Sequence, residues 1–200
     1  MKYDEKYTAL DREALMQAVQ MRMSERRFKH VLGVEETAVA LAERFGGSPK
    51  KASIAALTHD YAKERSDEEF KLAIAQGNYE NKTELLKYGN AIWHGLVGAD
   101  FVARELEITD EEILNAIRLH TTGAAEMTLL DKIIYVADYI EPGRHFPGVE
   151  DARVIAFSDL DQAVAFETKH TLAHLIESET PVYPKTIETY NLSLIHISEP

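Results

Sequence analysis

Six side chains of the kinds that bind metals lie in otherwise apolar stretches of this sequence: His30, the adjacent His59 and Asp60, His94, His120 and Asp138. A buried imidazole or carboxylate must have a partner, because burying it alone is costly or forces it to lose its charge. A second residue, a solvated edge or a metal ion would each serve. A mixed set of nitrogen and oxygen donors suits Fe, Mn, Co, Ni or Zn better than Mg or Ca.

Each of these residues taken alone has a simpler interpretation as a surface or hydrogen-bonded core residue. The other histidines show the contrast. His170 and His174 are four residues apart and share a helix face, but charged neighbours indicate a solvated face, and His145 is interpreted in the same way. His196 lies in the final residues and is given no role.

The composition excludes several classes of protein. The chain has 200 residues, of which 45% are hydrophobic, and it contains no cysteine, so disulfides and thiolate sites are excluded. The net charge of −12 argues against sequence-independent nucleic-acid binding. We find no apolar run long enough for a membrane span and no apolar leader near Met1, and we expect a cytoplasmic protein.

The apolar periodicity predicts helix after helix and no convincing strand. Residues 8–23 and 24–45 read as the first two helices, and Ser48–Pro49 starts a third that carries His59 and Asp60. Capping boxes at Ser66–Glu69 and Thr109–Glu112 would open two more. Further helices are expected over 90–106, over 128–140 as a central buried helix, and over 152–179 as one or two.

We therefore predict one all-α domain of seven to nine helices over residues 1–191. The remaining residues, 192–200, fit poorly and resemble a non-native addition.

The short sequence motifs around these polar residues are more specific than the residue types alone. "RRFKHVLGV", "AALTHDYAK", "WHGLVGA", "NAIRLHTTG", "DKIIYVADYIEPGR" and "PVYPKTIETYN" occur in this order. They resemble the YqeK-type HD-domain family, the bacterial symmetrical diadenosine tetraphosphate hydrolases. The resemblance covers about residues 10–191, with no departure at a motif position.

The resemblance implies a metal-dependent phosphohydrolase with a helical HD-domain fold. Its metal ligands would be His30, His59, Asp60 and Asp138, holding one or two iron ions for which Mn, Co, Ni or Zn could substitute. A metal-activated water would cut the substrate into two ADP molecules.

The resemblance also implies residues that act on the substrate. Asp60, Lys63, His94 and His120 would be catalytic, with Asp60 orienting the water, and His94 and His120 would face phosphates or complete a second metal site. Lys63 lies one helical turn from His59 and could reach a phosphate, as could Arg144 after the turn. The predicted substrate contacts are His30, Asp60, Tyr61, Ala62, Lys63, His94, His120, Thr121, Asp138, Arg144, Tyr183, Pro184, Lys185 and Thr186.

Two alternatives remain open at this point. One is an HD phosphohydrolase that acts on guanosine tetraphosphate or a nucleoside monophosphate, and the other is a non-catalytic nucleotide sensor. In each case the expected partner is a small-molecule nucleotide, with neither nucleic acid nor membrane involved, and the chain is expected to be a monomer or a homodimer.

Overall fold

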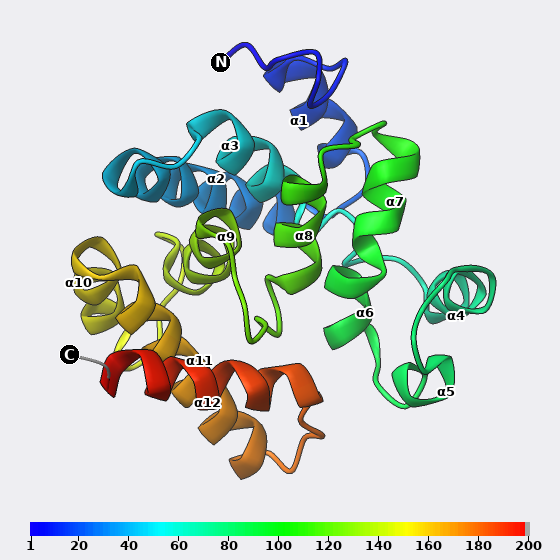
Figure 1. Cartoon of the computed structure of the whole chain (residues 1–200). Coiled ribbons are helices and arrows are strands. Elements are labelled where there is room, and N and C mark those ends of the chain that lie inside the picture. The colour runs from blue at the N-terminus through cyan, green and yellow to red at the C-terminus, as the bar shows by residue number, and fades with distance from the viewer. Residues whose placement is uncertain (199–200) are drawn as a thin grey trace.

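The computed structural model describes residues 1–198, with side chains up to residue 194, as an all-α fold (Figure 1). Twelve helices occur in this part of the chain: α1 (Arg12–Gln20), α2 (Glu25–Phe45), α3 (Pro49–Thr58), α4 (Asp67–Gln76), α5 (Lys82–Leu85), α6 (Asn90–Leu96), α7 (Gly98–Glu105), α8 (Glu111–Leu119), α9 (Leu129–Ile140), α10 (Val149–Ser158), α11 (Leu160–Glu177) and α12 (Pro184–Ser198). The predicted fold class is confirmed, and the predicted number of helices was too low.

Local capping signals set most of the predicted helix ends. Ser24 caps α2, which ends at Gly46 in the left-handed conformation (φ 75°), a conformation that glycine adopts without steric cost. Ser48 caps α3 with Pro49 in the first turn, and the capping box of Ser66 and Glu69 opens α4. The predicted starts at Ser48–Pro49 and at the Ser66–Glu69 capping box are confirmed.

The capping box predicted at Thr109 was wrong. The side chain of Asp110 accepts the N–H of Ile113 and is the N-cap of α8. Asp is as good a cap as Thr or better, and Glu112 instead forms an ion pair with Lys51.

The helix predicted over 90–106 is divided at Val97 into α6 and α7. Gly95 and Gly98 flank this break. A Cβ atom at Gly95 would lie 3.2 Å from the His120 ring, and one at Gly98 would lie 3.2 Å from the Cβ of Ala62. Two glycines, which favour helix weakly, let the backbone bend there and approach both neighbours. The final predicted segment likewise divides at Asp159, whose extended backbone ends α10 and caps α11.

Helix α9 is the central buried helix, as predicted. It lies among α2, α3, α8, α10 and α11 (Figure 1). Its buried side chains occur on several sides: Leu130, Ile133, Ile134, Tyr135, Val136, Ala137 and Ile140. Burying each large one contributes about 1.5–3 kcal/mol, so α9 is a rigid support for the residue it carries in its last turn, Asp138.

The C-terminal segment packs against α11 as helix α12. Residues 192–198 of the predicted tail continue this helix. Residues 199–200 and the side chain of His196 lie outside the described part of the chain. The predicted domain limits stay a prediction. Within residues 1–198, none of the helices has the length and apolar character needed to cross a bilayer.

Candidate metal centre and active site

Three separate elements bring the predicted metal ligands together. His30 lies on α2, Asp138 lies on α9, and His59 and Asp60 follow the last residue of α3. His30 Nε2 lies 3.1 Å from Asp138 Oδ1 and 3.7 Å from Asp60 Oδ2. His59 Nε2 lies 3.6 Å from Asp60 Oδ2 and 4.0 Å from Asp138 Oδ1.

The prediction that His59 and Asp60 lie within the third helix was wrong. Helix α3 ends at Thr58, His59 is its C-cap, and Asp60 belongs to the turns that follow. The backbone there tightens to i→i+3 hydrogen bonds, as from Tyr61 N–H to Thr58 O. Adjacent side chains of a regular helix diverge, whereas this turn lets both face the same point.

The spacing of these side chains suits metal binding, with His59 shared by two groups of three possible ligands. The Nε2 atoms of His30 and His59 are buried and neither makes a hydrogen bond, which is costly for a buried polar atom. Ligands bound at about 2.1 Å lie roughly 3 to 4.2 Å apart at angles of 90° to 180°, and the four distances fall within this range. In the described part of the chain, the ligand groups whose donor atoms lie within 4.8 Å of one another are His30–His59–Asp138 and His59–Asp60–His120.

Backbone carbonyls fix the orientation of three histidine rings. The Nδ1 atoms of His59, His94 and His120 lie 2.7, 2.6 and 2.7 Å from the carbonyl oxygens of the preceding helical turn. Each Nδ1–H therefore donates to a carbonyl, which leaves Nε2 as a lone pair directed into the site. Metal-binding histidines are commonly held in this way.

The rings of His94 and His120 face each other on the buried side of the site. Their Nε2 atoms are 3.0 Å apart, and the Thr121 hydroxyl lies 3.3 and 3.2 Å from them. Burial lowers the pKa of His94 well below its usual value and that of His120 to about 4, so both are neutral near pH 7. Two lone pairs this close repel unless a cation or a donor lies between them. The Thr121 hydroxyl can donate to one of them, and Lys63 Nζ, 3.2 Å from His94 Nε2, is a further donor on the His94 side.

Asp60 lies between the two groups of histidines. Its Oδ2 faces His59 and accepts a hydrogen bond of 2.8 Å from Arg27, and its Oδ1 lies 3.4 Å from His94 Nε2 and 3.8 Å from His120 Nε2. Burial alone would raise the pKa of Asp60, but the neighbouring histidines lower it below its usual range. The carboxylate is therefore ionised and directs one oxygen to each side.

Asp138 is ionised for a related reason. Burial would raise its pKa, but the close approach of His30, whose Nε2 lies 3.1 Å from Oδ1, and the charges of His59 and Arg144 hold it well below its usual range. Arg144 donates to Asp138 Oδ1 at 2.6 Å, so its guanidinium lies at the site as expected. Burial tends to lower the pKa of Lys63, and the net shift is downward.

Two residues with a role at this site were missed from the sequence. Arg27, one turn before His30, binds Asp60. Glu141 Oε1 lies 3.1 Å from His30 Nδ1, and its Oε2 accepts the Gly143 N–H. Burial would lower the pKa of His30, but the neighbouring carboxylates of Asp138 and Glu141 raise it overall. Both residues lie within the motifs named above, Arg27 in "RRFKH" and Glu141 in "YIEPGR". A charged side chain close to a predicted ligand was the feature of the sequence that could have identified them.

Other predicted substrate contacts interact with residues outside the group of predicted metal ligands. The Tyr61 hydroxyl donates to Glu105, and Ala62 is buried against Gly98. Tyr183 packs edge-on against Tyr88 at 4.9 Å. The following residues Pro184, Lys185 and Thr186 begin α12, whose Thr189 donates to Thr122 O, two residues after His120.

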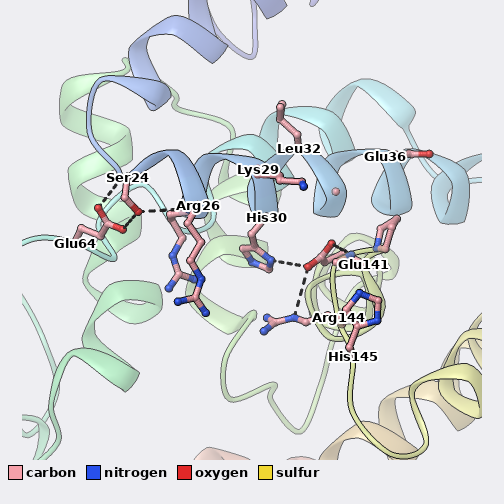
Figure 2. A pocket seen from close by; sticks show the side chains of 14 residues that line it. Ser24, Arg26, Lys29, His30, Leu32, Glu36, Glu64, Glu141, Arg144 and His145 are labelled. Carbon is pink, nitrogen blue, oxygen red and sulfur yellow. Dashed lines mark hydrogen bonds and ion pairs between the residues drawn. The ribbon is translucent and has the colours of Figure 1, made fainter.

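The histidines expected to be solvated differ from the predicted metal ligands. His170 and His174 are exposed, and His170 stacks on Phe166 with ring centroids 4.0 Å apart. His145 is exposed at the edge of a groove of about 750 Å³ (Figure 2). This groove opens beside His30 and passes Glu141 and Arg144.

Comparisons with known proteins agree with this geometry. The HD domain family model matches residues 27–143. Two relatives are both called "Bis(5'-nucleosyl)-tetraphosphatase, symmetrical". The one from Bacillus subtilis is 48% identical over 91% of this chain and 97% of its own length, and the one from Staphylococcus aureus is 42% identical over 85% and 88%.

A solved structure shares the fold. The crystal structure of a "predicted HD superfamily hydrolase involved in NAD metabolism" from Clostridium acetobutylicum matches with a TM-score of 0.89 and 37% identity, covering 94% of this chain and 98% of that one.

Proposed function

Because this chain belongs to the HD domain family, we propose that it hydrolyses diadenosine tetraphosphate symmetrically to two ADP. This chain covers nearly the whole length of two relatives named for this activity. The proposal of a metal site rests on the buried Nε2 atoms of His30 and His59, which make no hydrogen bond. Water adds across the central P–O–P bond: its oxygen joins one phosphorus, and the other ADP leaves with the bridging oxygen.

We propose that His30, His59, Asp60 and Asp138 hold a divalent metal ion. Two imidazole nitrogens and two carboxylates suit iron, with Mn, Co, Ni or Zn as substitutes. An ion bound there lowers the pKa of water and neutralises phosphate oxygens. Asp60, with Oδ1 directed away from His30 and His59, accepts a hydrogen bond from the attacking water and orients it.

The facing rings of His94 and His120 support a second cation. Their neutral Nε2 lone pairs would repel a phosphate oxygen rather than bind it, since a neutral nitrogen whose proton is on Nδ1 can only accept. We therefore propose a second ion at this pair, with Asp60 and His59 as neighbours. Two ions per wild-type chain and one in His94→Ala are expected by elemental analysis, and one ion in both would contradict it.

The cationic side chains position the phosphates. Lys63 and Arg144 neutralise charge on the reacting phosphate and on the departing ADP, and Thr121 donates a hydroxyl to a phosphate oxygen. Tyr183, Pro184, Lys185 and Thr186 are proposed to contact the nucleoside half that lies on the side of His120, together with Tyr61 and Ala62 in the turns after Asp60.

Product analysis tests the proposal against its alternatives. Chromatography of the reaction with diadenosine tetraphosphate should show ADP as the only nucleotide product. Asp60→Ala should lose metal and activity while keeping near-native helix content by circular dichroism. AMP with ATP, release of phosphate from a nucleoside monophosphate, or binding without turnover would contradict symmetrical hydrolysis. The cytoplasmic location and the monomer or homodimer state stay predictions.

A further inference from the structure

The groove beside the metal centre is lined by more cations than carboxylates, although the whole protein is acidic. The chain carries −12 overall, yet four cationic side chains line this groove of about 750 Å³: Arg26, Arg27, Lys29 and Arg144. Three acidic side chains also line it: Glu64 is bonded to Ser24, Glu141 is bonded to His30, and Glu36 is exposed. A concave basic site in an acidic protein attracts a polyanion selectively.

Two of the four cations have no partner. Arg27 binds Asp60 and Arg144 binds Asp138, so both belong to the metal centre. Arg26 and Lys29 make neither an ion pair nor a side-chain hydrogen bond within the described residues. Both are exposed in the groove and are free to bind a ligand (Figure 2).

The helix register places these two cations next to the reacting centre. Arg26 and Lys29 are three residues apart on α2, and Arg26 is four residues before His30. Residues at these spacings share one helix face, so a ligand in the groove that reaches His30 can contact both. Leu32 and Pro142 add apolar surface further along the groove.

The substrate has two identical halves, and the site has two sides. The buried side holds His94, His120, Lys63 and Thr121, none of which lines the groove, and the groove begins at His30. A bond cut at the centre of the substrate places one nucleoside diphosphate on each side of the ligands.

We propose that this groove binds the departing nucleoside diphosphate, and that Arg26 and Lys29 bind its phosphates. This inference rests on the proposed function. It assigns Arg26 and Lys29 to substrate specificity: they favour a substrate whose polyphosphate continues past the cut.

Charge reversal with a matched control tests the groove. The double variant R26E/K29E is compared with K71E/K169E, which makes the same change of charge at two exposed positions on α4 and α11. The assay measures bound metal, KM for diadenosine tetraphosphate, and Kd for ADP, which is expected to occupy the buried side. A charge-assisted hydrogen bond corresponds to about tenfold or more in affinity.

We expect R26E/K29E to raise KM for diadenosine tetraphosphate at least tenfold, with bound metal and the Kd for ADP unchanged and K71E/K169E close to wild type. R26A/K29A should show the same effect more weakly. A KM equal to that of the control, or an equal loss of ADP affinity, would overturn the assignment of these residues to the departing half. If the wild-type protein forms no ADP from diadenosine tetraphosphate, the proposed function itself fails, and this inference fails with it.

Discussion

Removing the Glu141 carboxylate is expected to weaken metal binding through His30. Glu141 Oε1 lies 3.1 Å from His30 Nδ1, the carboxylate is almost fully buried, and the Gly143 N–H holds its other oxygen. Among the described residues, no other group forms a hydrogen bond with His30 Nδ1. In Glu141→Ala the ring loses the acceptor that keeps the proton on Nδ1 and Nε2 directed into the metal site.

The magnitude follows from this single contact. A hydrogen bond to a charged group contributes about 1.5–3 kcal/mol, which is roughly a tenfold to hundredfold change in an equilibrium constant. Losing the outer partner of a metal-binding histidine costs about the same range in metal affinity or activity. Glu141→Gln keeps an acceptor oxygen of the same shape, so we expect it to lose less than about tenfold.

Competition against a chelator measures the effect. Metal-free protein is titrated with Fe²⁺ or Mn²⁺ for the wild type, Glu141→Ala, Glu141→Gln and a control, Glu43→Ala. The control removes an exposed carboxylate from α2, the helix that carries His30. Thermal unfolding of each metal-free variant shows that it is folded, and Glu141→Gln carries the test if the alanine variant is not. A metal affinity of Glu141→Ala within twofold of the control would refute the reasoning.

Four further results are expected. Lys63→Ala should keep its metal and lose about tenfold in kcat/KM for diadenosine tetraphosphate; loss of metal would instead show that Lys63 supports the ligands. Gly33→Ala should lower metal affinity although alanine favours helix by about 0.5–1 kcal/mol, because the new Cβ would lie 2.5 Å from Glu141 Oε2; unchanged affinity would contradict this. Burial raises the pKa of Glu167 well above its usual 4.5, so above this pH the unfolded chain binds fewer protons than the folded protein and stability falls. The free energy of unfolding of metal-free Glu167→Gln should therefore exceed that of metal-free wild type by an amount that grows by up to about 1.4 kcal/mol for each pH unit above 4.5. Parallel pH profiles of the two proteins in calorimetry would disprove this. His170→Ala should change neither metal content nor turnover in the same assays.

Helix ends that depend on neighbouring residues could be predicted from the sequence. Ser48 and the Ser66–Glu69 box act within one turn, and the all-round apolar pattern of residues 128–140 indicated a buried helix. The break at Val97 could not be predicted, since it depends on the approach of Gly98 to Ala62, far apart in the chain.

The site shows the same limit. Residue type and the surrounding motifs predicted one site made of His30, His59, Asp60 and Asp138. The structure brings these side chains within ion-pair distance of one another. The partnership of Glu141 with His30 spans 111 residues and has no local pattern. The turn that aligns His59 with Asp60 was likewise hidden, because the apolar run before it continues the helical period.

Stepwise loading of metal tests the central claim most directly. Metal-free protein is given increasing Fe²⁺ under anaerobic conditions, and bound iron and the products from diadenosine tetraphosphate are measured on each sample. We predict that ADP is the only nucleotide product and that its rate rises with bound iron up to two ions per chain. ADP formed at full rate by metal-free protein, or full loading without any ADP, would contradict the claim.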